Sequence, residues 1–140
     1  MGTVIRPELM PGNKYWIERH RYYELKHFCL QYPIWKKAYA ALDGLSSRSG
    51  DLTMISKHSD IPDPTAKCAE SALFYSERME MVERAAKETS DSVLSDYILM
   101  GVTQGLSYDN LKTMHNIPCC KAVYYELYRR FFWILNKIRQ

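Results

Sequence analysis

The sequence predicts an all-α protein: a compact bundle of five to six helices that ends in a helix-turn-helix with a long C-terminal helix. Apolar residues recur at helical spacing through most of the 140 residues, and β-branched residues nowhere alternate as a strand requires. Capping residues, prolines and glycines divide the chain into segments of helical length. The length, with 46% hydrophobic and 25% charged residues, suits one globular unit.

The N-terminal segment, residues 1–44, is expected to hold a pair of helices. Asn13 follows a Pro-Gly step and is a suitable N-cap for a first helix over residues 13–31. The dipeptide Tyr32-Pro33 ends this helix, because proline disfavours helical geometry at the residue before it.

A second helix is predicted over residues 33–43. Proline is favoured in the first turn of a helix, where its missing amide costs no hydrogen bond, and Gly44 is a typical C-terminal stop. Residues 45–63 contain Ser, Gly, Asp and Pro without a sustained period. We therefore expect a connecting loop there.

The remaining residues 64–140 are expected to pack with residues 1–44 as a single compact unit. The longest helix is predicted over residues 64–89, where an apolar stripe lies opposite glutamates and basic residues at i, i+4 spacing. A helix over about residues 91–103 follows. Its expected boundaries are a cap at Ser90 or Asp91 and a stop at Gly105.

Residues 106–140 carry the spacing of a helix-turn-helix. Ser107 can cap a short helix, and Asn116 is the kind of residue that tolerates a left-handed turn. Ile117 then supplies an apolar plug, and Pro118 starts a second helix that continues nearly to the C-terminus. The alternative is a plain antiparallel helical hairpin within a bundle.

Positive charge is concentrated at the two ends of the chain. Seven basic and four acidic residues give +3 in residues 1–44, six and ten give −4 in residues 45–105, and six and two give +4 in residues 106–140. A basic end beside an acidic middle indicates a polyanionic partner, most simply nucleic acid, although solvated helices also carry such an excess.

If the motif reads DNA, its second helix presents its first turns to the major groove. The candidate DNA-binding residues are Lys112, Cys119, Lys121, Tyr124, Tyr125, Arg129 and Arg130. Lys121 is the best candidate for a base edge or a phosphate, whereas Arg129 and Arg130 suit phosphates. Tyr124 and Tyr125 either face DNA or fill the core.

The chain resembles the RinA/ArpU-like late-gene transcriptional regulators of phages and prophages. The resemblance is carried by an aromatic helix broken at a Tyr-Pro step (F-C-L-Q-Y-P-I-W-K, residues 28–36) and by residues 96–132, which end in Y-Y-E-L-Y-R-R-F-F. It implies a helix-turn-helix of the sigma-factor region-four type that binds promoter DNA. Cys119 and Cys120 stand where this family usually has several Arg, Lys or Ser residues.

We therefore expect a cytoplasmic phage or prophage regulator that binds double-stranded DNA as a monomer or dimer, with RNA polymerase as a further candidate partner. One alternative is a protein–protein adaptor, because the 11 Tyr, 4 Phe and 3 Trp exceed what a small core requires. The other is a small terminase-type subunit, which would assemble into rings.

An enzyme is not expected. The sequence has no Gly-rich phosphate loop and no nucleophile elbow, and its four Cys and four His match no zinc spacing, so we expect no cofactor and no metal. It also has no run of about 20 apolar residues and no apolar stretch near Met1, so we expect neither a membrane partner nor a secretory signal.

Overall fold

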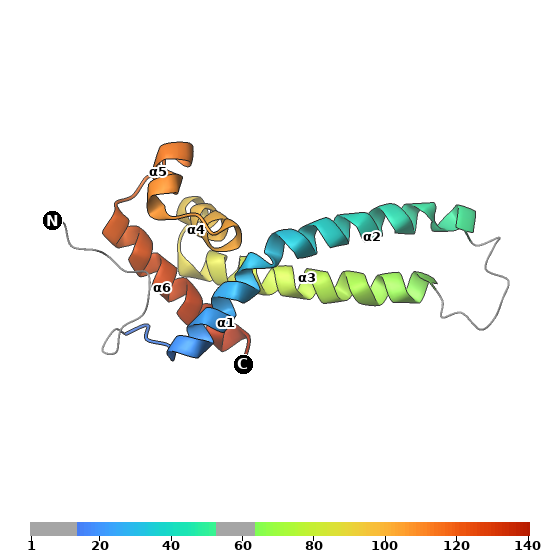
Figure 1. The fold of residues 1–140 in the computed structure, drawn as a ribbon, viewed down its shortest axis with the longest axis horizontal. Coiled ribbons are helices and arrows are strands. Elements are labelled where there is room, and N and C mark those ends of the chain that lie inside the picture. Colours follow the sequence, from blue (N-terminus) through green and yellow to red (C-terminus); the bar gives the residue numbers. More distant parts are fainter. Residues whose placement is uncertain (1–13, 53–63) are drawn as a thin grey trace. The chain divides into compact units, whose positions relative to one another are not determined.

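The computed structural model describes residues 14–52 and 64–140. These residues form six α-helices and no strand (Figure 1). The helices are α1 (Arg19–Leu30), α2 (Tyr32–Leu52), α3 (Pro64–Thr89), α4 (Ser92–Gln104), α5 (Tyr108–His115) and α6 (Lys121–Ile138). The predicted all-α fold with five to six helices is confirmed.

Several predicted helix ends are confirmed, and local hydrogen bonds explain them. The carboxylate of Asp91 accepts a hydrogen bond from the Leu94 amide at 2.9 Å and so caps α4. Gly105 ends α4 with a φ of 67°, a left-handed conformation that glycine adopts without a steric penalty. Helix α3 occupies the predicted residues 64–89.

The predicted start of the first helix is wrong. Helix α1 begins at Arg19 because the Glu18 carboxylate accepts hydrogen bonds from the amides of His20 and Arg21, at 3.0 and 3.3 Å. These bonds satisfy two amides that have no partner within the helix. Asn13, the expected cap, lies outside the described residues.

The predicted end of the second helix is also wrong, since α2 continues through Gly44 to Leu52. Residues 45–52 of the expected loop are therefore helical, and residues 53–63 lie outside the described part of the chain. A glycine inside a helix costs only about 1 kcal/mol relative to alanine, so helical turns on both sides can offset it.

By their contacts the helices group into two units, whereas the sequence predicted a single one. Of the described residues, the first unit comprises 14–32 and 81–140, with α1, the end of α3, α4, α5 and α6. The second comprises 33–52 and 64–80, with α2 and the first part of α3. Helix α1 therefore belongs with the C-terminal helices rather than with its neighbour α2.

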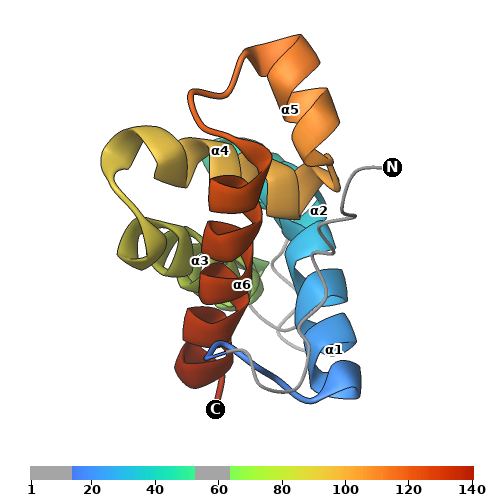
Figure 2. The ribbon, with the colours of Figure 1, turned by 90° about the vertical axis from the view of Figure 1, so that its left-hand side faces the viewer.

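The core of the first unit forms around α6, which contacts α1, α4 and α5 (Figure 2). The largest fully buried side chains are Leu25, Cys29, Val82, Ile98, Leu111, Ile117, Tyr124, Phe131, Phe132 and Leu135. Burial of each large apolar side chain contributes roughly 1.5–3 kcal/mol. Burial also raises the pKa of the Cys29 thiol, which therefore stays protonated and packs as a small apolar group.

Buried tyrosines join α1 to α6. The hydroxyls of Tyr22 and Tyr128 share a hydrogen bond of 3.0 Å, and the Tyr22 ring meets Phe132 edge-on at 5.2 Å between centroids. Burial raises the pKa of the Tyr128 hydroxyl, which keeps it protonated as a donor or acceptor. Many of the chain's aromatic side chains thus lie in the core rather than on the surface.

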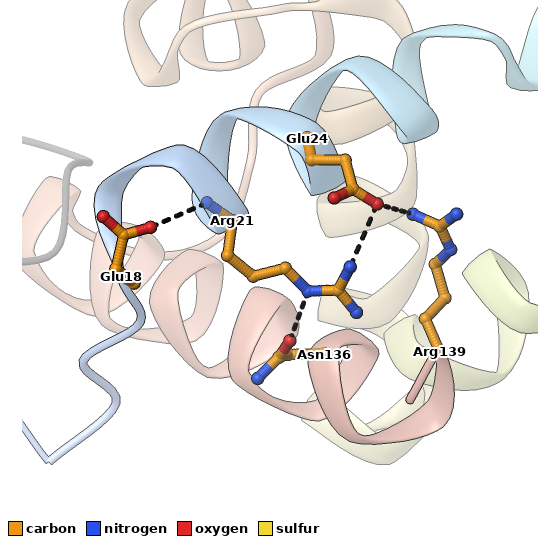
Figure 3. Close-up of polar contacts among 5 residues, drawn as sticks. All are labelled: Glu18, Arg21, Glu24, Asn136 and Arg139. Carbon is orange, nitrogen blue, oxygen red and sulfur yellow. Dashed lines mark hydrogen bonds and ion pairs between the residues drawn. The ribbon is translucent and has the colours of Figure 1, made fainter.

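A polar network ties the C-terminal end of α6 to α1 (Figure 3). Arg21 Nε donates to the Asn136 side-chain oxygen at 2.7 Å, and Glu24 accepts from both Arg21 and Arg139 at 2.9 Å. The Arg139 guanidinium also lies over the Phe28 ring, 3.9 Å from its centroid. Arg139 is therefore engaged in holding the first unit together.

Close packing between α4 and α6 generates a test of the core. A Cβ at Gly101 would overlap the Tyr124 hydroxyl, which is buried and has no hydrogen-bond partner among the described residues. We expect Gly101→Ala to lower the free energy of unfolding by about 1–3 kcal/mol, measured by urea denaturation. Tyr124→Phe should leave it unchanged or raise it, because no hydrogen bond is lost.

The double variant is the control for this prediction. Because removal of the hydroxyl opens the space that the new methyl needs, Gly101→Ala in the Tyr124→Phe background should cost less than in the wild type. Equal costs in the two backgrounds would contradict the proposed overlap.

Candidate nucleic-acid interface

The helix α5 has the two ends that the sequence predicted. The Ser107 hydroxyl accepts a hydrogen bond from the Asn110 amide at 3.3 Å and caps the first turn. Asn116 ends the helix with a φ of 51°, in the left-handed region. The next amide, that of Ile117, donates to the Leu111 carbonyl at 3.3 Å. The chain leaves α5 in one defined direction as a result.

Side chains from α5 also fix the turn between α5 and α6. The Ile117 and Leu111 side chains are fully buried, so the predicted apolar plug is present. The Tyr108 hydroxyl donates to the Cys119 carbonyl at 2.7 Å, and Lys112 Nζ donates to the Ile117 carbonyl at 3.4 Å. Residues 116–120 are therefore bonded at several points and hold the start of α6 in place.

The predicted start of the second helix is wrong by three residues. Helix α6 begins at Lys121, with Cys120 as its extended N-cap, so Pro118 and Cys119 lie in the turn. The bond from Tyr108 to the Cys119 carbonyl holds this stretch out of the helix. The candidate Cys119 is half-buried, and burial together with Cys120 raises the pKa of its thiol, which favours an inert, protonated group.

The candidates Tyr124 and Tyr125 are core residues and cannot contact DNA from these positions. Tyr124 is only 1% exposed, and its ring packs against those of Tyr108, Tyr125 and Tyr128. The Tyr125 hydroxyl accepts a long hydrogen bond of 3.4 Å from the Tyr108 amide. These two tyrosines position α6 against α5 and so support the turn from inside.

The basic candidates differ in how much of each side chain reaches the surface. Lys112 on α5 and Arg130 on α6 are exposed, whereas Lys121 and Arg129 are half-buried. Lys121 and Arg130 are nine residues apart, which corresponds to roughly 13 Å along a helix. The exposed pair Lys112 and Arg130, together with Lys121, offers positive charge on both helices of the motif.

The spacing of the motif predicts core positions at Ala122 and Val123, two apolar residues between these cations, and this prediction is wrong. Both are exposed in the first turn of α6, and Val123 is 43% exposed. At 100° per residue Ala122 lies roughly opposite the buried positions 124, 128, 131 and 135, whereas Val123 lies at the edge of the buried face. Only the packing of α6 decides which of its sides is buried.

The segment before α1 covers the later part of the outer face of α6. Lys14 forms an ion pair of 3.6 Å with Glu126, and the Tyr15 ring stacks on Trp133 at 5.6 Å between centroids. Lys137 lies over the Trp133 ring, 3.3 Å from its centroid. These contacts leave the first turn of α6 as its open end, and sequence spacing gave no signal for them.

Other kinds of site were sought in the part of the chain that the structure describes. There, no group of three or more His, Cys, Asp or Glu side chains is placed to hold a metal ion. None of the helices, over their described residues, has the length and apolar character needed to cross a membrane. The chain matches no protein-family model, and comparisons with curated proteins and with solved structures find no similar protein.

The left-handed turn at Asn116 generates a second test. We expect Asn116→Gly to keep the free energy of unfolding within about 0.5 kcal/mol of the wild type, because glycine adopts positive φ freely. Asn116→Val should lower it by about 1–2 kcal/mol, because a β-branched residue is strained there. Thermal unfolding followed by circular dichroism measures both, and equal stability of the two variants would contradict the strained turn.

Proposed function

We propose that the chain binds double-stranded DNA through α5, the following turn and the exposed side of α6 from Lys121 to Arg130. The observation that carries this proposal is the turn, in which Asn116 and the buried Ile117 set a short helix against the start of a longer one. In the helix-turn-helix mode of binding, such a helix start enters the major groove while the preceding helix lies across the backbone.

The chemistry of the exposed residues supports this proposal. Lys112 and Arg130 suit phosphate oxygens, and Lys121 at the helix start is within reach of a phosphate or a guanine edge. The start of α6 has no side-chain cap, so its amides can donate to a phosphate. Ala122 and Val123 offer apolar contact to thymine methyl groups.

The biological role is proposed from the resemblance to RinA/ArpU-like regulators. It supports a cytoplasmic phage or prophage regulator that binds promoter DNA and assists RNA polymerase. The departure from the family pattern at the helix start is consistent with the geometry here, since Cys119 and Cys120 precede α6 rather than opening it. Base readout would then depend on residues 121–123.

Fluorescence anisotropy with a labelled duplex, across a salt series, tests DNA binding. We expect affinity to fall steeply with salt, because each phosphate contact contributes about 0.9 to the slope of log K against log salt concentration. Lys121→Ala/Arg130→Ala should weaken binding about tenfold or more and reduce that slope by about 1–2.

The matched control is Arg84→Ala/Lys87→Ala, which removes the same charge from exposed residues of α3. This control should bind nearly as the wild type does. Equal losses in both variants would indicate a general charge effect instead of a site on α6, and no binding at low salt would contradict the proposal.

A protein–protein adaptor is the second candidate, and one surface of α4 favours it. Val93, Tyr97 and Met100 line a shallow groove of about 510 Å³ together with Asp96 and His115. Val93 is largely exposed and, with Tyr97 and Met100, gives the groove apolar surface that a partner protein could cover. This candidate becomes the working hypothesis if the anisotropy experiment shows no binding to DNA.

A further inference from the structure

The described side chains of the second unit form almost no core. Among its described side chains, residues 33–42 and 66–80, only Trp35 is buried. Helix α2 and the first part of α3 run in opposite directions (Figure 1), and the side chains on their less exposed faces are only half-buried. Since helices in water depend on burial of an apolar face, such a pair requires a further surface to become stable.

Large apolar side chains on the pair are open to solvent. Ile34 and Tyr39 on α2, and Leu73 and Phe74 on α3, are each at least 41% exposed. Single exposed apolar residues are ordinary, but four on two helices mark an interaction surface. The Arg78 guanidinium covers one face of Phe74, 3.3 Å from the ring centroid. Ile34, Tyr39 and Leu73 therefore provide most of the apolar surface that a partner could contact.

Over one stretch of the pair the exposed charges have opposite signs. Within residues 33–42 of α2 the exposed charged residues are Lys36 and Lys37, whereas within residues 71–80 of α3 they are Glu77 and Glu80. Earlier in α3, the exposed Lys67 and Glu70 have opposite charges and cancel one another. Burial and the nearby Glu83 carboxylate raise the pKa of Tyr32, so the start of α2 lies near residue 83 of α3. Because the two helices run in opposite directions, Lys36 and Lys37 then lie level with residues 77–80 of α3.

We propose that this helix pair, residues 33–52 and 64–80, is a dimerisation element whose occupant is a second copy of the chain. The two pairs lie side by side and point the same way, with α2 of each copy against α3 of the other, as a four-helix bundle. Lys36 and Lys37 of one copy then face Glu77 and Glu80 of the other.

A second copy fits better than an unrelated partner because the surface complements itself. A two-fold axis brings each patch opposite the other, so opposite charges at one level form the same contact twice. A dimer also buries the apolar residues of both pairs in one step. This inference stands on the second unit alone and does not depend on DNA binding.

Light scattering coupled to size-exclusion chromatography measures the mass directly. The full chain should elute with twice its 16.4-kDa mass at micromolar concentration. Two charge-reversal variants test the contacts, Lys36→Glu/Lys37→Glu and Glu77→Lys/Glu80→Lys. Each alone should dimerise about tenfold more weakly, because like charges then face one another in both contacts.

The decisive experiment mixes the two variants. In the mixed dimer every contact pairs opposite charges again, so an equimolar mixture should recover the wild-type mass. Misfolding of either variant cannot produce this recovery. Arg84→Glu/Lys87→Glu, two charge reversals outside the pair, is the control and should remain dimeric.

Three results would overturn the proposal. These are a wild-type chain that stays monomeric throughout the concentration range, a mixture that stays monomeric while the wild type dimerises, and a ring of many copies. The ring would instead support the terminase-type alternative. Ile34→Asp/Leu73→Asp should also give a monomer with retained helical circular dichroism, and a dimeric double variant would contradict the apolar contact.

Discussion

Burial of one aromatic face of α6 is the constraint on which the first unit depends. Phe131 and Phe132 are fully buried, the Tyr128 hydroxyl is hydrogen-bonded to that of Tyr22 on α1, and Tyr124 fits against α4 only because position 101 has no side chain. This single face therefore fixes α6 against both α1 and α4. The tyrosine rings contribute apolar area, and the Tyr128 hydroxyl finds a partner in the core, whereas the Tyr124 hydroxyl has none among the described residues.

The core and the candidate interface are two sides of the same short segment. Tyr108 packs on Tyr124 through its ring and bonds to the turn through its hydroxyl, so the burial that stabilises α6 also orients its start. Because the candidate interface residues lie on α5 and on α6 itself, the same contacts set the orientation of their side chains. A preorganised surface pays little conformational entropy on binding, which is an advantage for a motif with few cations.

The two units stabilise themselves by different means. The first has its own aromatic core and a network at Glu24 that fastens the end of α6, whereas the second exposes apolar residues such as Ile34 and Leu73 along two long helices. A helix pair with one buried side chain among its described residues is incomplete in physical terms. The proposed dimerisation through the second unit would account for this difference in the burial of apolar side chains.

The sequence by itself determined the helical class and those ends that local bonds set: Asp91, Ser107, Asn116 and Gly105 act through hydrogen bonds or φ values within one or two turns. Only the tertiary structure decided which side of α6 is buried, and thus that Tyr124 and Tyr125 are core. It also decided that α2 passes Gly44 and that Cys119 lies in a turn held by Tyr108. These features depend on contacts between residues far apart in the chain, whose energies no local pattern encodes.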